Sequence, residues 1–260
     1  MQTYVPGVLF RRAAAWSALL LAYCYLASAL HAQTGRESRY YSRTNSFGFF
    51  IAYSNDSSHM LLGDAEQRKL LEFGASYSRR LLIGREVNWQ YSAEFLPIAV
   101  ESDPLTRVVI SQTSPSKETI VMDGKSPFVT CHPPAYAFSV VDGDTTYAGT
   151  ETLSCRGRRW TMGEAMSPIG MQWNFRPAYK LQPFLNWHGG FMYSTKEIPV
   201  DSAGSFNFTF GIGAGLELYR TRTRSFRLEY RYHHISNDET ATSNPGIDNS
   251  LFQVTYTFGH

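Results

Sequence analysis

The stretch FNFTFGIG, residues Phe206–Gly213, alternates with a strict two-residue period. Its even positions are bulky and apolar, whereas its odd positions are small or polar. Successive side chains of a β-strand point to opposite faces, so this pattern predicts a strand with one apolar and one polar face. We expect the apolar face to meet hydrocarbon and the polar face to line an interior.

The same alternation recurs at Val87–Phe95 and at Ile169–Phe175. Most candidate strands approach the roughly 9–11 residues that a tilted membrane-spanning strand needs. The sequence therefore predicts an all-β protein, an eight-stranded antiparallel transmembrane β-barrel. The eight candidate strands cover residues 46–54, 69–78, 87–97, 168–176, 181–193, 205–218, 225–236 and 249–258.

Loop lengths support the same topology. The connections at 79–86, 177–180 and 219–224 are short, whereas those at 55–68, 98–167, 194–204 and 237–248 are longer. Outer-membrane barrels pair short periplasmic turns with longer external loops, so both ends of the mature chain should be periplasmic. The last strand is aromatic and alternating close to the chain end, which resembles the signal read by the outer-membrane assembly machinery.

A soluble antiparallel barrel or sandwich is the rival fold, because it would hide its apolar face in a core. The polar faces of the strands favour the membrane barrel. There, small residues accompany Arg176, Glu217, Arg227, Glu229 and Arg231, a mixture typical of the filled polar interior of a narrow barrel. The formal net charge of +2 over 260 residues argues against a general nucleic-acid binder.

The N-terminus predicts an exported protein. Arg11 and Arg12 precede an apolar run to Ala29, with small-residue cleavage sites after Ala29 or Ala32. Residues 1–32 are therefore expected to be a signal peptide and residues 33–260 a single outer-membrane barrel domain. A retained membrane anchor is the alternative, and a lipoprotein site at Cys24 is disfavoured by the bulky residue before it.

Two cysteines remain after removal of this signal, Cys131 and Cys155. In an oxidising compartment the pair predicts a disulfide, with two free buried thiols as the alternative. A metal site is weaker, because only His132 adjoins Cys131 and nothing else has ligand spacing. The segment around them, about 98–167, is polar with little sustained periodicity, and we expect a long external loop or small subdomain stapled by the disulfide.

A cluster of polar residues lies in the lipid-facing phase of the last two strands. His234 and Ser236 share even numbering with Phe226, and Asp248 shares the phase of Phe252, whereas His233 falls in the inward phase. Because polar groups on a lipid-facing wall are costly, we interpret the cluster as functional. Taken singly, each residue is more ordinarily a solvated rim or turn residue.

The cluster has the composition needed for acyl transfer to water. Ser236 would attack an ester carbonyl, His234 would act as base and then acid, and Asp248 would orient the imidazole. Residues two apart on a strand share a face, so the side chains of Ser236 and His234 can converge. Oxyanion donors are expected from Asn237 and from backbone amides near it or Gly246. The rival carboxylates Asp238 and Glu239 lie in the loop.

At these residues the chain resembles the outer-membrane lipid A 3-O-deacylases, also classed as acyloxyacyl hydrolases. Their His-x-Ser-Asn motif corresponds to His234–Asn237, and their Asn-Pro-Gly-like segment to Asn244–Gly246. Their acidic residue, usually Glu, corresponds to Asp248. The similarity covers about residues 165–258. It implies an eight-stranded barrel that removes the ester-linked 3-hydroxyacyl chain at the 3-position of lipid A without an organic cofactor. The sequence itself shows no metal site with convincing ligand spacing.

The resemblance also suggests how lipopolysaccharide would bind in the outer membrane. Acyl chains could lie on an apolar wall made by Phe226, Leu228, Tyr230, Phe252 and Val254. Lipid A phosphates could meet Arg156, Arg158 and Arg159, for which a solvated patch is the plainer interpretation. The alternative function is a non-catalytic outer-membrane barrel with a structural or adhesive role for its long loop.

Overall fold

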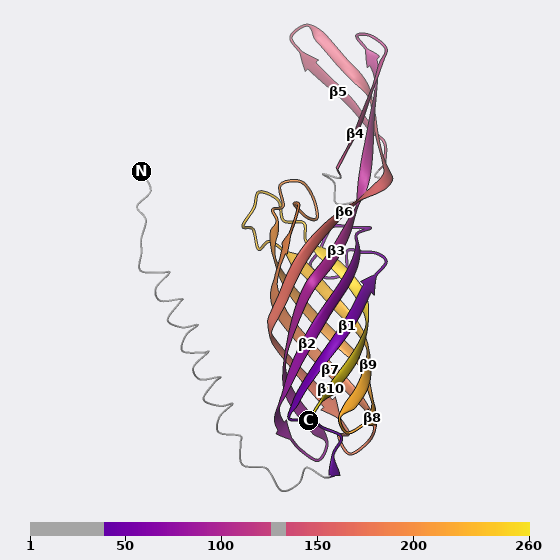
Figure 1. The fold of residues 1–260 in the computed structure, drawn as a ribbon. Coiled ribbons are helices and arrows are strands. Elements are labelled where there is room, and N and C mark those ends of the chain that lie inside the picture. Colours follow the sequence, from indigo (N-terminus) through magenta and orange to yellow (C-terminus); the bar gives the residue numbers. More distant parts are fainter. Residues whose placement is uncertain (1–38, 126–133) are drawn as a thin grey trace, which may run out of the picture.

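A computed structural model describes residues 39–125 and 134–260. Within these ranges no helix has the length and apolar character needed to cross a membrane. The described residues form ten strands (Figure 1): β1 (Asn45–Ser54), β2 (Lys69–Ile83), β3 (Val87–Ser114), β4 (Glu118–Lys125), β5 (Tyr136–Asp142), β6 (Thr145–Phe175), β7 (Leu181–Ser194), β8 (Phe206–Thr221), β9 (Arg224–Ser236) and β10 (Ile247–Gly259).

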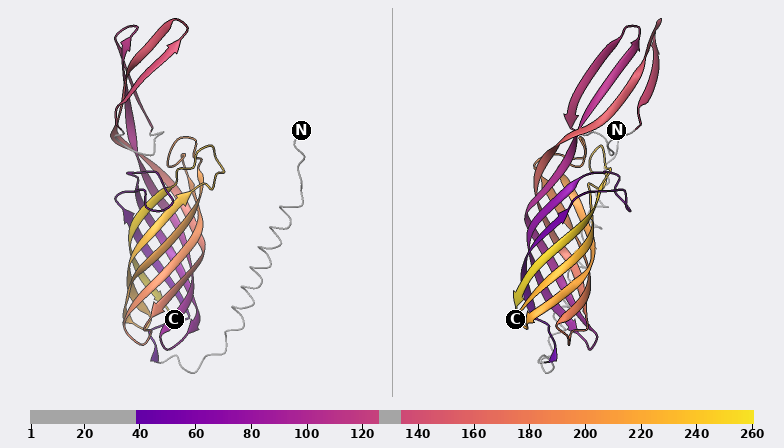
Figure 2. Two further views of the ribbon diagram at one scale, coloured as in Figure 1. Left: turned by 180° about the vertical axis from the view of Figure 1, so that it is seen from behind. Right: turned by 90° about the vertical axis from the view of Figure 1, so that its right-hand side faces the viewer.

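Eight of these strands close into a barrel, in the order β1-β2-β3-β6-β7-β8-β9-β10 (Figure 2). Every neighbouring pair is antiparallel, and β10 returns to pair with β1 from Ser46↔Gly259 to Tyr53↔Phe252. The predicted eight-stranded barrel is therefore confirmed. Each predicted strand is present, but β3 and β6 run well beyond the predicted ranges 87–97 and 168–176, whereas the other six differ by a few residues at their ends. Closure leaves the barrel itself without an unpaired strand edge.

The walls of the barrel follow the alternation in the sequence. In β8, Phe206, Phe208 and Phe210 are exposed on the outside, while Asn207 and Thr209 are buried inside. Of the charged residues predicted to fill the interior, four are buried there: Glu217, Arg227, Glu229 and Arg231.

Arg176, the fifth residue of that set, was predicted wrongly. It lies in the turn after β6 with a φ of 59°, and its guanidinium stacks on the Tyr179 ring at 4.4 Å from the centroid. The strand ends at Phe175, so the side-chain alternation no longer applies at the next residue.

The two ends of the barrel differ in their connections. Residues 84–86, 176–180 and 222–223 form short turns at one end, where the C-terminus also lies (Figure 1). Residues 55–68, 195–205 and 237–246 form longer loops at the other, which we term the long-loop end. The rule for outer-membrane barrels would place the long-loop end at the exterior and both termini in the periplasm. This orientation stays a prediction.

The segment 98–167 is not the irregular loop that its weak periodicity suggested. Strands β3 and β6 continue past the barrel wall, and β4 and β5 flank them in a projecting four-stranded sheet (Figure 2). This sheet, termed the extension, contains the β-branched run Val108–Ile110, which suits strands. Most of its described side chains are exposed or half-buried, so no single buried face imposes a two-residue period.

Two expectations fall outside the described part of the chain. Residues 1–32, the predicted signal peptide, precede it, and Cys131 lies in the undescribed segment 126–133. Cleavage after Ala29 or Ala32, and the pairing of Cys131 with Cys155, therefore stay predictions.

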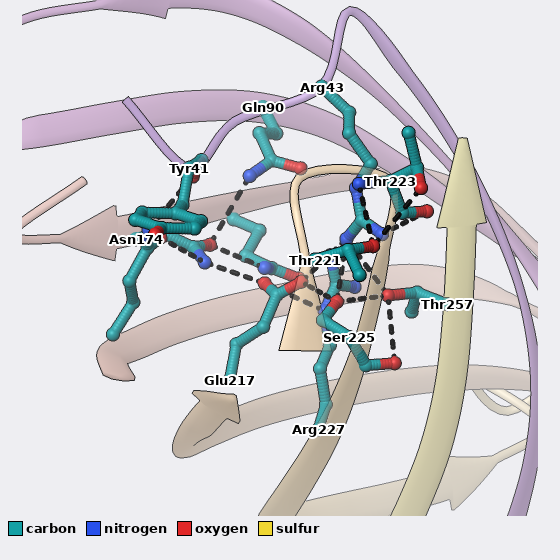
Figure 3. A network of polar contacts seen from close by, with 12 residues as sticks. Tyr41, Arg43, Gln90, Asn174, Glu217, Thr221, Thr223, Ser225, Arg227 and Thr257 are labelled. Carbon is teal, nitrogen blue, oxygen red and sulfur yellow. Dashed lines mark hydrogen bonds and ion pairs between the residues drawn. The ribbon is translucent and has the colours of Figure 1, made fainter. Parts of the chain in front are cut away.

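A buried polar network closes the short-turn end of the barrel (Figure 3). Arg43, just before β1, donates through Nη2 to Glu217 Oε1 at 2.7 Å, to Ser225 Oγ at 2.7 Å and to Thr257 Oγ1 at 2.9 Å. Arg227 Nε lies 3.0 Å from the other carboxylate oxygen of Glu217. One carboxylate thus pairs with two buried guanidinium groups, which ties the N-terminal segment to β8, β9 and β10.

Replacing Glu217 with alanine should lower the free energy of unfolding by about 3–5 kcal/mol, because it leaves two buried cations without their carboxylate. Urea unfolding in lipid vesicles, followed by loss of the heat-modifiable gel mobility of the barrel, measures the change. Glu164→Ala, at an exposed position of β6, is the control and should differ from the parent by less than about 0.5 kcal/mol. Equal effects of the two substitutions would contradict this account of the network.

Candidate active site at the long-loop end

His234 and Ser236 lie on the outer face of β9, close to the long-loop end. Odd-numbered residues of β9 are buried in the interior, whereas these two side chains are half-buried on the opposite face. The neighbouring His233 points inward, with Nδ1 3.9 Å from Glu72 Oε1. The directions predicted from residue parity are thus those found in the structure.

Asp248 reaches His234 from the adjacent strand. The two residues are direct partners in the β9–β10 register, and His234 Nδ1 lies 2.6 Å from Asp248 Oδ1. Cross-strand partners hold their side chains close together on one face, so the backbone register alone brings these groups into contact. By contrast, Asp238 and Glu239 lie in the exposed turn after β9, with φ values of 50° and 59°.

Asp248 is fully buried although it lies on the outer face of the barrel, because the first outer loop, residues 55–68, covers it. Ser57 and Ala65 of this loop bridge to Asn249 and Ile247 of β10. The backbone amides of Leu61 and Leu62 donate to Asp248 Oδ2 at 2.8 and 2.9 Å.

The other oxygen of the carboxylate is shared. Tyr232 donates its hydroxyl to Asp248 Oδ1 at 2.8 Å, beside the contact from His234. With its acceptors occupied by fixed donors, the carboxylate is held in one orientation. The Asp248 carboxylate accepts a hydrogen bond from His234 Nδ1, so the ring hydrogen of a neutral His234 lies on Nδ1. Nε2 is then left as the basic nitrogen.

Two glycines allow this close packing. A Cβ on Gly63 would lie 2.7 Å from the Asp248 amide nitrogen and 2.9 Å from its Oδ1. A Cβ on Gly246, which has a φ of +64°, would lie 2.9 Å from Cε1 of the His234 ring. The loop and the turn before β10 can therefore approach the pair only because both residues lack a side chain.

Ser236 is placed beside the pair without being bonded to it. Among the described residues, the Ser236 hydroxyl makes no hydrogen bond, and the side chain is half-buried on the same face as His234. The structure therefore brings His234 and Asp248 together and leaves Ser236 adjacent with its hydroxyl unengaged. Catalytic hydrogen bonds commonly tighten only when substrate is bound.

Asn237, expected to help bind an oxyanion, has a different surrounding. It is 1 % exposed, and its side-chain amide donates to Ala203 O at 2.5 Å and to Ser243 O at 2.7 Å. Its backbone amide donates to Asn244 Oδ1 at 3.1 Å. Asn237 thus stabilises the loop after β9. Its backbone and side-chain N–H groups already donate within the protein, so they do not point to an oxyanion. Gly246, the other expected contributor, lies against the imidazole ring.

An apolar wall descends from the site along β9 and β10. Its members are between 47 % and 63 % exposed on the outer face, as the sequence predicted: Phe226, Leu228, Tyr230, Phe252 and Val254. Tyr230 also donates its hydroxyl to Ser250 Oγ at 2.7 Å, directly below the His234–Asp248 pair.

The arginines expected to meet phosphate are mostly engaged within the protein. Arg159 Nη2 pairs with Asp103 Oδ2 at 2.5 Å, and Arg158 Nε donates to Ser102 Oγ at 2.7 Å. Both side chains therefore stabilise the junction of the barrel and the extension, and neither belongs to a solvated patch. Arg156 alone of the three is exposed.

Tyr232 and the loop residues Leu61 and Leu62 were missed by the sequence reasoning. Tyr232 carried a usable signal, because it shares the outward parity of His234 and precedes it by two positions. The loop carried none, since it donates to Asp248 through backbone amides that every residue except proline provides.

Comparison with known proteins identifies a matching family model. The family model described as lipid A 3-O-deacylase (PagL) matches residues 137–257, which confirms the resemblance expected from the sequence. The match starts within β5, earlier than about residue 165 where the resemblance was expected to begin. The chain is an outer-membrane protein of the Gram-negative type of envelope, as predicted.

The solved structures that match the chain include the outer membrane enzyme PagL, at 12 % identity and a TM-score of 0.45, covering 82 % of this chain and 99 % of that one. Neisserial surface protein A has 10 % identity and a TM-score of 0.41, with 84 % and 97 % covered. OprG from Pseudomonas aeruginosa has 11 % identity and a TM-score of 0.38, with 84 % and 98 % covered. Among curated protein sequences, none matches significantly.

Proposed function

We propose that this protein is a lipid A deacylase, which hydrolyses the ester-linked 3-hydroxyacyl chain at the 3-position of lipid A with Ser236, His234 and Asp248. The observation that carries the proposal is the hydrogen-bonded His234–Asp248 pair on the outer wall of the barrel, beside Ser236, whose hydroxyl makes no hydrogen bond to any residue in the described ranges. The family match over residues 137–257 supports the substrate class.

In the proposed reaction, Ser236 Oγ attacks the ester carbonyl while its proton passes to His234 Nε2. Asp248 accepts the hydrogen bond from Nδ1 and stabilises the imidazolium that forms. The tetrahedral intermediate then collapses, His234 returns the proton to the sugar 3-oxygen, and the deacylated sugar leaves. Water, activated by His234 in turn, releases the 3-hydroxy fatty acid from Ser236. Backbone amides near Gly246 are the proposed donors to the oxyanion.

The position of the site suits this substrate. The triad is at the long-loop end of the outer wall, where the ester of an outer-leaflet lipid would lie if that end faces the exterior. The acyl chains would then extend along the apolar wall of β9 and β10. Arg156, exposed on β6, is a proposed contact for a lipid A phosphate.

The projecting extension favours the alternative, a non-catalytic barrel with an adhesive role, since Tyr136, Val140 and Val141 are exposed on it. Expression in a Gram-negative host with intact lipid A separates the two functions. Mass spectra of extracted lipid A should show the loss of one 3-hydroxyacyl chain for the deacylase. An unaltered lipid A profile, with the barrel folded in the outer membrane, would favour the adhesive role.

Gly63→Ala should lower the rate of deacylation at least about tenfold, because the new methyl group displaces the first outer loop from Asp248. Gly189→Ala on β7 is a matched control, since the nearest atom to its Cβ is Trp187 Cζ3 at 3.9 Å. Both variants should retain the gel mobility of a folded barrel. Full activity of Gly63→Ala would show that the loop need not touch the carboxylate.

A further inference from the structure

The first outer loop connects the catalytic carboxylate to the lipid-facing surface. Its backbone holds Asp248 through the amides of Leu61 and Leu62. The position of residues 61 and 62 therefore influences the orientation of Asp248 and, through it, of the His234 ring. The loop lies outside the residues matched by the family model.

The side chains of the same two residues point away from the protein. Leu61 is 72 % exposed and Leu62 64 % exposed, and Met60 beside them is also exposed. Two adjacent leucines in water are unfavourable, and an exposed apolar group of this kind commonly marks a contact surface.

The tip of the loop is continuous with the apolar wall of the barrel. Ser250 Oγ lies 3.5 Å from Met60 Sδ, and Phe252, one of the most exposed wall residues, is two positions further along β10 on the same outer face. A wall that faces membrane hydrocarbon thus extends upward onto Met60–Leu62. This continuity favours lipid chains over another protein as the partner.

We propose that hydrocarbon chains of the outer leaflet take up the side chains of Leu61 and Leu62, and that this docking holds the loop amides on Asp248. The site then reaches full activity only when the loop tip is seated in lipid. The inference rests on the proposed deacylase function for its catalytic consequence, whereas the docking itself can be measured without catalysis.

Docking is tested with Leu62→Trp in vesicles of phosphatidylcholine with and without brominated acyl chains. After subtraction of the parent signal, emission from the added tryptophan should fall at least twofold in brominated vesicles and resist aqueous iodide. Val141→Trp on β5 of the extension, at a site 68 % exposed, should show the reverse. Quenching of Leu62→Trp by iodide and not by bromine would overturn the proposal.

The coupling to Asp248 is tested with Leu61→Ser/Leu62→Ser. Deacylation in vesicles should fall about tenfold, and the labelling of Ser236 by a fluorophosphonate should slow in parallel. The conservative variant Leu61→Met/Leu62→Met preserves the apolar side chains and should restore both the deacylation rate and the labelling rate. Val140→Ser/Val141→Ser is the control pair. Parent-like labelling of the folded serine variant would overturn the coupling. Parent protein that labels normally but leaves lipid A unchanged would instead refute the deacylase function.

Discussion

Ser236→Ala is expected to lower lipid A deacylation by about 10³-fold or more, because it removes the hydroxyl proposed to form the acyl intermediate. Purified barrel in mixed micelles, with the released 3-hydroxy fatty acid measured by mass spectrometry, gives the rate. His234→Ala should have a comparable effect, since Ser236 and its base act as one unit. The residual rate would come from substrate binding alone.

The matched control is Ser250→Ala. Ser250 is a second serine on the outer face, on β10, and it is directly opposite Tyr232. Its hydroxyl accepts from Tyr230 and does not contact His234. Loss of activity in Ser250→Ala, with Ser236→Ala still active, would show that the nucleophile has been assigned to the wrong serine.

Asp248→Asn is expected to lower the rate by about 10³–10⁴-fold while leaving the fold intact. The amides of Leu61 and Leu62 require an acceptor, so the oxygen of the new side chain should turn toward them. Its NH₂ group then faces His234 Nδ1, which must become an acceptor and carry its proton on Nε2. In that tautomer the imidazole cannot take the proton of Ser236.

Nitrogen chemical shifts of labelled His234 would report this change of tautomer directly. Asp238→Asn, in the exposed turn after β9, is the control and should retain the parent rate. If Asp248→Asn kept both its activity and the Nδ1-protonated tautomer, the carboxylate would have no orienting role.

Much of this fold could be predicted because a membrane barrel imposes a two-residue period on every wall strand. That period placed Phe206–Gly213 in β8 and the charged residues Glu217 and Arg227 in the interior. It failed beyond the wall, where β3 and β6 run on into the extension with no lipid on one side and no filled interior on the other. The pairing register of strands joined by long loops likewise cannot be predicted from the local residue pattern.

The directions of the site residues followed from the same parity, but their surroundings did not. His234 and Asp248 were predicted to share a face and are found in contact. The burial of Asp248 depends on a loop that is distant in the sequence and donates through its backbone; Leu61 is 187 residues away. Asn237 occupies the motif position where an oxyanion donor was expected. Its side-chain amide instead donates to the carbonyls of Ala203 and Ser243.

The central claim is that the outward-facing Ser236–His234–Asp248 site hydrolyses the 3-position ester of lipid A. It is tested most directly by incubating the purified, folded protein with lipid A of defined acylation and determining the structure of the product by mass spectrometry. The account predicts one free 3-hydroxy fatty acid for each lipid A molecule converted, with the other acyl chains retained. Intact lipid A after prolonged incubation with the folded barrel would contradict it.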